Sequence, residues 1–332
     1  MKLRMTRRRL RSMIDFDIQW EALAQEVNKS GIRRVYPDHI LDFFVGYSED
    51  GERQLAIMHR GATVPPLDLP TFENLDVIAE SHKGEFKILL VIKNKELEDK
   101  FTVMCFDIAE SSKESLSSIE ALKKVAKSLS RWADLFKTSN PARLKMNQAI
   151  GLWGEIKILK DLIEENIEGV DVVVRGWRGP NGDQKDIGYN RRRIEIKTQL
   201  STRKTQLAIS SLDQLDDNVE MLMIVLNRVS PADDGYSILD LVKITQNLIR
   251  ESKEATLDFK RKIILAGYDD TDDQCKAKYA LNEMLIYKVN DTFPRLIPRN
   301  VPVGITSAQY AILCSAITSF EIKWSALVEG MK

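Results

Sequence analysis

The stretch from Asp186 to Lys197 constrains the fold of this chain more than any other part of the sequence. Within it, Ile194 and Ile196 alternate with Glu195, so a strand places the two isoleucines on one face. The same strand places Glu195 and Lys197 together on the opposite face. We therefore expect a sheet that buries one apolar layer and displays an acid and a base next to each other.

A two-residue turn at Asn190 and Arg191 would make this stretch a hairpin in which Asp186 lies opposite Glu195. Directly opposed Cβ atoms lie ~4.5–5.5 Å apart, so the two carboxylates would repel each other unless a cation bound between them. Asn-Arg is a weaker turn signal than Asn-Gly, which leaves the length of the turn open. Asp183 is the alternative acidic ligand, although its loop position suits it less well. The pattern predicts a divalent metal site.

The other metal-binding residue types are scarce. The three histidines are His39, His59 and His82, so no Ser-His triad or His-ligated zinc is expected in the second part of the chain. The three cysteines are scattered, which argues against a disulfide framework and fits a cytoplasmic protein. No apolar run approaches the ~18–20 residues that span a bilayer. Oxygen ligands remain, and these favour Mg2+ or Mn2+.

The charge of the chain is balanced overall but not locally. There are 49 basic and 49 acidic residues, so net charge gives no argument for a nucleic-acid partner. Residues 175–204, however, hold three acidic side chains and nine basic ones, which are Arg175, Arg178, Lys185, Arg191, Arg192, Arg193, Lys197, Arg203 and Lys204. Such a local patch is what a polyanionic partner requires.

Glu155 lies in an amphipathic helix predicted over residues 141–165. Its neighbours at helical spacing include Leu152 and Leu159, so it is on or beside the apolar stripe, where an unpaired charge is costly. It could form a buried salt bridge with a nearby arginine, or it could reach into the metal site. Gly151 and Gly154 permit close approach of the helix backbone.

The order of the predicted elements indicates an α/β protein of two domains. A strand-rich α+β domain is expected over residues 1–137, and a mixed sheet with flanking helices over residues 138–332. The first contains hairpins 41–47/53–59 and 86–93/101–108 and helix 116–136. The second contains, besides the hairpin and helix above, strands 170–175, 206–210, 221–228, 262–266 and 281–289 and helices 238–251 and 306–319. The basic N-terminal arm is either solvated or in contact with phosphates.

Glu155, Asp186, Glu195 and Lys197 together resemble the PD-(D/E)XK nuclease superfamily, the fold of many restriction endonucleases. Gly-Leu-Trp-Gly-Glu at 151–155 and Ile-Glu-Ile-Lys-Thr at 194–198 resemble more narrowly the "PD-(D/E)XK motif protein" family of prokaryotic restriction-like defence loci. The resemblance covers about residues 120–250 well. One departure is Lys185, which stands where the superfamily often has proline before the aspartate.

This resemblance implies a metal-dependent deoxyribonuclease of the type II restriction-endonuclease kind. Asp186 and Glu195, with the Ile196 carbonyl, would bind Mg2+ (or Mn2+), and Glu155 would support that metal or a second one. Lys197 would orient or deprotonate the attacking water. The N-terminal domain would recognise DNA or dock a partner, and a homodimer or a complex with other restriction subunits is expected.

Several polar residues near this site are candidates for contact with double-stranded DNA, and each has an alternative. Contacts are expected from Arg191, Arg192, Arg193, Gln199, Arg203 and Lys204, although the arginines could be a solvated turn and Gln199 a surface residue. Ser210, Ser211 and Gln214 are weaker candidates for the DNA backbone. We interpret Trp177 as an anchor of the core or of its loop rather than as a platform on which a base stacks. Two further interpretations remain: a subunit that binds DNA without cutting it, and a scaffold in which the acids pair with Arg191–Arg193.

Overall fold

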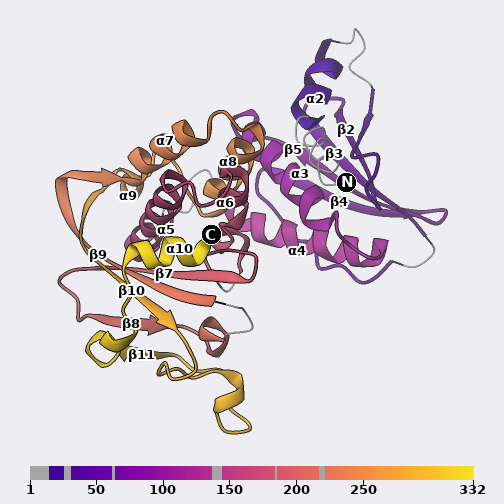
Figure 1. Cartoon of the computed structure of the whole chain (residues 1–332). Coiled ribbons are helices and arrows are strands. Elements are labelled where there is room, and N and C mark those ends of the chain that lie inside the picture. The colour runs from indigo at the N-terminus through magenta and orange to yellow at the C-terminus, as the bar shows by residue number, and fades with distance from the viewer. Residues whose placement is uncertain (1–14, 26–30, 62–63, 137–143, 184, 217–220) are drawn as a thin grey trace. The chain divides into compact units, whose positions relative to one another are not determined.

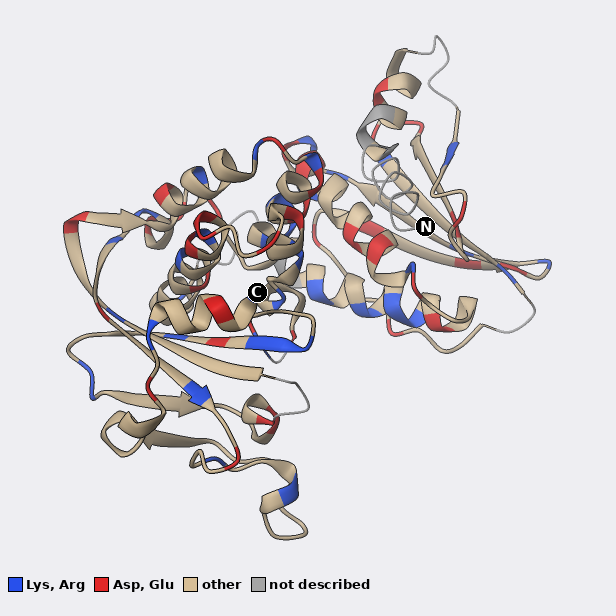
Figure 2. Cartoon of the chain, viewed as in Figure 1, with Lys and Arg blue, Asp and Glu red and all other residues tan. Residues whose placement is uncertain are grey.

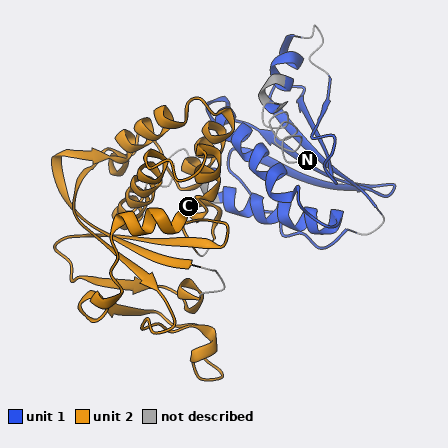
Figure 3. Cartoon of the chain, viewed as in Figure 1, with its two compact units in different colours: residues 1–142 blue, residues 143–332 orange. Residues whose placement is uncertain are grey.

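The computed structural model describes residues 15–25, 31–61, 64–136, 144–183, 185–216 and 221–332 (Figure 1). The basic N-terminal arm and residues 137–143, where the domain boundary is predicted, lie outside the described residues. The chain divides into two compact units, Met1–Ala142 and Arg143–Lys332 (Figure 3). The helices and strands of both units define a mixed α/β fold, as the sequence predicts.

Unit 1 contains a five-stranded antiparallel sheet in the order β1-β2-β3-β5-β4. Its strands are β1 (Arg33–Val35), β2 (Asp42–Tyr47), β3 (Arg53–Arg60), β4 (Leu75–His82) and β5 (Glu85–Ile92). Its α-helices are α2 (Asp15–Gln25), α3 (Glu98–Ser112) and α4 (Ser118–Phe136). The β2–β3 hairpin and α4 confirm two of the sequence predictions for this unit.

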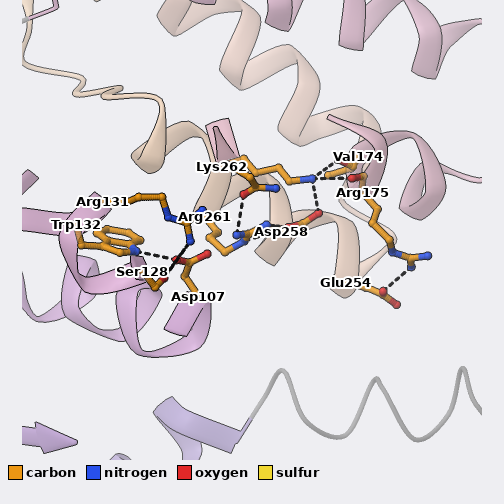
Figure 4. Close-up of polar contacts among 11 residues, drawn as sticks. Asp107, Ser128, Arg131, Trp132, Val174, Arg175, Glu254, Asp258, Arg261 and Lys262 are labelled. Atoms are coloured by element: carbon orange, nitrogen blue, oxygen red, sulfur yellow. Dashed lines mark hydrogen bonds and ion pairs between the residues drawn. The ribbon is translucent and has the colours of Figure 1, made fainter. Parts of the chain in front are cut away.

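The second predicted hairpin of unit 1 is wrong, because β5 pairs with β4 and residues 101–108 are helical. The buried residues Phe101, Met104, Cys105 and Ile108 recur at helical spacing. Asp107 of α3 is 1% exposed and accepts hydrogen bonds from three side chains of α4 (Figure 4), which are Ser128, Arg131 and Trp132. A buried carboxylate with three donors holds the two helices together.

Unit 2 is built on a four-stranded mixed sheet in the order β10-β9-β7-β6. Its strands are β6 (Ile187–Tyr189), β7 (Arg192–Leu200), β9 (Met221–Ser237) and β10 (Lys278–Val289). β7 and β9 are parallel and the other neighbouring strands are antiparallel. A separate pair, β8 (Gln206–Ile209) and β11 (Tyr310–Leu313), is also antiparallel.

The two faces of the four-stranded sheet have different covers. Ile194 and Ile196 of β7 belong to a core that they share with α5 (Met146–Glu164), α6 (Val170–Gly176), α7 (Ile238–Ile249), α8 (Lys253–Leu265) and α10 (Trp324–Met331). Leu222, Ile224 and Leu226 of β9 belong to a second core with residues of β8 and β11. The alternation of side chains along β7 therefore directs Glu195 and Lys197 toward the side of the second core.

Three further predictions for unit 2 are wrong. Residues 170–175 form α6 rather than a strand, and residues 262–266 belong to the end of α8. The predicted helix 306–319 contains β11, which pairs with β8, followed by short 3-10 turns. Strands β8, β9 and β10 and helices α5 and α7 confirm the remaining predictions.

Charged residues are distributed over both units, and the start of β7 is basic (Figure 2). Among the described residues, no helix combines the length and the apolar character that a membrane crossing demands.

Candidate active site

The hairpin β6–β7 has the predicted two-residue turn. Ile187 pairs with Ile194, and Tyr189 pairs with Arg192, which leaves Asn190 and Arg191 at the tip. Both tip residues have positive φ, 47° and 61°, as a type I′ turn requires. The register therefore aligns Asp186, just before β6, with Glu195 of β7.

Asp186 lies just before the start of β6, where the described pairing between β6 and β7 stops. Its Oδ2 accepts a hydrogen bond of 2.7 Å from the Ile196 amide. Its own carbonyl accepts hydrogen bonds from the amides of Arg178 and Gly179, at 2.6 and 3.1 Å. Burial raises the pKa of the Asp186 carboxyl to about 6, although the Ile196 amide and Lys197 act in the opposite direction.

Glu195 is 3% exposed and has two donors on one oxygen. Its Oε1 accepts from Lys197 Nζ at 2.9 Å and from Gln214 Nε2 at 2.6 Å. Its Oε2 is buried and has no hydrogen-bond partner among the described residues. Burial and the charge of Asp186 raise the pKa of Glu195 to about 7. A buried carboxylate oxygen without a partner is costly, so it is a site that a cation would stabilise.

Glu155 joins these two acids from α5. Its Oε2 accepts a hydrogen bond of 2.8 Å from Trp177 Nε1. Among the described residues it has no ion pair with an arginine, so the salt-bridge interpretation is wrong. Burial and then the charge of Asp186 raise the pKa of Glu155 to about 8. All three carboxyls therefore hold protons more tightly than usual.

Two glycines bring α5 and the loop after α6 close to the sheet. A Cβ on Gly154 would lie 1.8 Å from Thr198 Oγ1, so α5 packs directly on β7 only with glycine there. A Cβ on Gly179 would lie 2.7 Å from Glu155 Oε2 and 3.2 Å from Asp186 Oδ1. The absence of a side chain at Gly179 thus preserves space between two acidic oxygens.

The last turn of α6, which leads into the loop that contains Trp177 and Gly179, is bound by side chains of α8 (Figure 4). The ammonium group of Lys262, 1% exposed, donates to the carbonyls of Val174 and Arg175 at the end of α6, at 2.6 and 3.0 Å. Asp258 pairs with that ammonium group at 2.9 Å. These contacts satisfy carbonyls that a helix end leaves free. They also fix the start of the loop that supports Glu155.

The oxygen atoms of this site fit a hard divalent cation. Asp186 Oδ1, Glu195 Oε2 and Glu155 are acidic, and Mg2+ needs only one or two carboxylates from a protein. A strand residue directs its amide and carbonyl to the same edge, so the Ile196 carbonyl faces the edge on which Asp186 lies. As the structure stands, no group of three or more His, Cys, Asp or Glu side chains among the described residues is arranged to hold a metal ion.

Two lysines supply positive charge beside the acids. Lys197 is 21% exposed and pairs with Glu195, so its ammonium group reaches both the acid and solvent. Lys185 is buried, and its Nζ donates to the Asp213 carbonyl at 3.2 Å. Burial lowers the pKa of Lys185, and Glu195 partly offsets that shift.

The predicted DNA-contacting residues lie around the hairpin and the turn after β7. Arg191, Arg203 and Lys204 are exposed, whereas Arg192 and Arg193 are half-buried. Arg193 donates to the Arg192 carbonyl at 2.8 Å, and Gln199 donates to the Lys204 carbonyl at 3.4 Å. Asp183 is exposed and pairs with Arg178 at 3.5 Å. Asp183 is thus a surface partner of an arginine.

Two contributors to the site escaped sequence reasoning. Gln214 was only a weaker candidate for contact with the DNA backbone, and in the structure it binds Glu195 and is buried. Trp177 is fully buried, as the anchor interpretation holds, but its bond to Glu155 was not foreseen. The only available signal for Gln214 was a polar residue between Leu212 and Leu215, which are both buried.

The mixed sheet, the acidic residue on α5 and the Asp and Glu-x-Lys of the hairpin together define a PD-(D/E)XK nuclease-like fold. More narrowly, a family model described as "Putative PD-(D/E)XK family member, (DUF4420)" matches residues 16–315. The chain belongs to this family, which confirms the resemblance to the PD-(D/E)XK superfamily. No curated protein and no solved structure matches the chain.

Proposed function

We propose that this protein is a Mg2+-dependent DNA endonuclease, with Mn2+ as a substitute metal. The observation that carries the proposal is the buried Glu195 Oε2, which has no hydrogen-bond partner in the described part of the chain although two donors occupy the other oxygen. Asp186, Glu195, Glu155 and the Ile196 carbonyl would hold the metal. The bound metal would lower the pKa of water and act as a Lewis acid toward a phosphodiester.

The chain's own groups have distinct roles in this proposal. Lys197 has an ammonium group at the boundary between Glu195 and solvent, so it can orient the attacking water and offset charge on the phosphate. Trp177 fixes Glu155 by donating to one of its oxygens. The Ile196 amide fixes Asp186 in the same way. The products would have a 5′-phosphate and a 3′-hydroxyl.

We further propose that the protein is the cutting subunit of a bacterial restriction-like defence system. This role rests on the resemblance of its motifs and on its family. Cleavage of both DNA strands needs two sites, so the protein would act as a homodimer or within a complex of restriction subunits. Unit 1 would then recognise DNA or dock a partner.

The test is incubation of the purified protein with plasmid DNA and Mg2+ or Mn2+, beside the variants Asp186→Ala and Lys197→Ala. Lys95→Ala, an exposed lysine of unit 1, is the matched control. We expect nicking or linearisation by the wild type and the control, and a loss of at least about 100-fold in both site variants. DNA binding without cleavage by the wild type would favour a non-cleaving subunit. Strong cleavage by both site variants would show that the active site lies elsewhere.

A further inference from the structure

Gln214 lies in η3 (Leu212–Leu215), a short 3-10 turn that follows β8. Its side chain is buried and makes contacts in two directions. The amide nitrogen donates to Glu195 Oε1 at 2.6 Å, while the amide oxygen accepts from the Ser210 backbone amide at 2.9 Å and from the Ser210 hydroxyl at 3.2 Å. Both ends of the amide are thus fixed, which leaves one orientation of the donor.

The turn that carries Gln214 is itself anchored by two cationic side chains. Lys185 Nζ donates to the Asp213 carbonyl at 3.2 Å, and Arg295 Nη1 donates to the Leu215 carbonyl at 2.8 Å. Both cations are about nine-tenths buried, and Leu215 belongs to the second core of unit 2. The position of the Gln214 side chain is therefore set by the fold and not by Glu195 alone.

The two oxygens of Glu195 have unequal surroundings as a result. Lys197 and Gln214 both donate to Oε1, whereas Oε2 is buried and receives no hydrogen bond from any residue that the structure describes. Lys197 is partly exposed and has a role toward the substrate in the proposed function, so its bond to Glu195 is available for exchange. Gln214 is enclosed, so it can keep Oε1 occupied when Lys197 turns to a phosphate.

We propose that Gln214 is a positioning residue that binds Oε1 of Glu195 and thereby reserves Oε2 for the divalent metal. This inference rests on the proposed function, because it assigns Glu195 to the metal. Partners that orient a metal ligand typically contribute 10–100-fold to metal affinity. Gln214 itself touches neither metal nor substrate.

The experiment measures Mn2+ binding to the metal-free protein by titration calorimetry, without DNA. Gln214→Met keeps the length and packing of the side chain but removes the donor. We expect it to weaken Mn2+ binding about 10-fold or more, with DNA binding in Ca2+ unchanged. Asp213→Asn, which changes an exposed side chain of the same turn, is the matched control and should bind Mn2+ like the wild type.

A second variant covers the case in which Gln214→Met fails to fold. Gln214→Asn keeps the amide but shortens it, so it cannot reach both Ser210 and Glu195, and it should also weaken Mn2+ binding. Melting curves in EDTA establish that each variant is folded. Wild-type affinity in a folded Gln214 variant, combined with loss of Mn2+ binding in Asp186→Ala, would overturn this inference and leave the proposed function intact. Absence of Mn2+ binding in the wild type would overturn both.

Discussion

The carboxyl groups of Glu155, Asp186 and Glu195 hold their protons tightly because burial penalises the charged forms, and for Glu155 and Glu195 the charge of Asp186 adds to this penalty. An acid whose pKa rises on folding binds more protons in the native state than in the unfolded state. Native stability is then fullest below the ordinary carboxyl pKa and falls as pH rises toward the raised value. These three residues therefore make the metal-free protein less stable in mildly alkaline solution.

Glu155 offers the clearest test, because its pKa changes from 4.5 to about 8. Glu155→Gln removes the charge but keeps an oxygen that can accept from Trp177. We expect the variant to stabilise the metal-free protein at pH 8 by on the order of 1–3 kcal/mol, and by much less at pH 5. Melting curves in EDTA at the two pH values measure this. Glu164→Gln, on the exposed face of α5, is the control, and its effect on stability should not increase from pH 5 to pH 8. If Glu155→Gln stabilised the protein equally at both pH values, the pKa of Glu155 would not be raised on folding.

At the scale of elements, the parts of the site that are close in sequence were predictable. The hairpin β6–β7 follows from alternation along twelve residues, which places Asp186 beside Glu195. The bond from Gln214 and the bond from Trp177 to Glu155 join residues on separate elements. Local alternation contains no information about such pairs.

The wrong element predictions have the same physical origin. The valines of α6 favour a strand locally, but two of them are buried in the core of unit 2 and Lys262 of α8 caps the carbonyls at its end. β11 owes its extended form to pairing with β8 about a hundred residues earlier. The wrong prediction for residues 101–108 has another origin. Their apolar residues recur at helical spacing in the sequence, so the helix could have been predicted in place of the hairpin.

Helix α5 contains a matched pair of glycines that tests how closely it packs on β7. A Cβ on Gly154 would lie 1.8 Å from Thr198 Oγ1 and 3.0 Å from Thr198 Cβ, whereas a Cβ on Gly151 meets nothing within 4 Å. We expect Gly154→Ala to destabilise the protein by about 1–3 kcal/mol and to weaken cleavage, because Glu155 moves with the helix. Gly151→Ala should stabilise the protein by about 0.5–1 kcal/mol. Urea unfolding measures both, and equal effects of the two changes would refute the close approach.

At the scale of the whole molecule, balanced charge means that any affinity for DNA must come from a local basic surface. The 49 basic and 49 acidic residues cancel, whereas residues 175–204 are strongly basic. Contacts with phosphates release counterions, and each contact contributes ~0.9 to the slope of log affinity against log salt. The slope therefore counts contacts, while net charge alone changes it little.

Arg203 and Lys204 provide this count, because their side chains are exposed and, in the described part of the chain, only their backbone groups form hydrogen bonds. The double variant Arg203→Gln/Lys204→Gln should lower the salt slope by about 1–2. The control Lys95→Gln/Lys127→Gln removes the same charge from exposed positions of unit 1, and it should leave the slope unchanged if unit 1 docks a partner and does not bind DNA. Fluorescence anisotropy with duplex DNA in Ca2+, over a range of salt concentrations, gives both values. An equal fall in both variants would mean that unit 1 shares the phosphate contacts. An unchanged slope in the first variant would place the DNA away from the turn after β7.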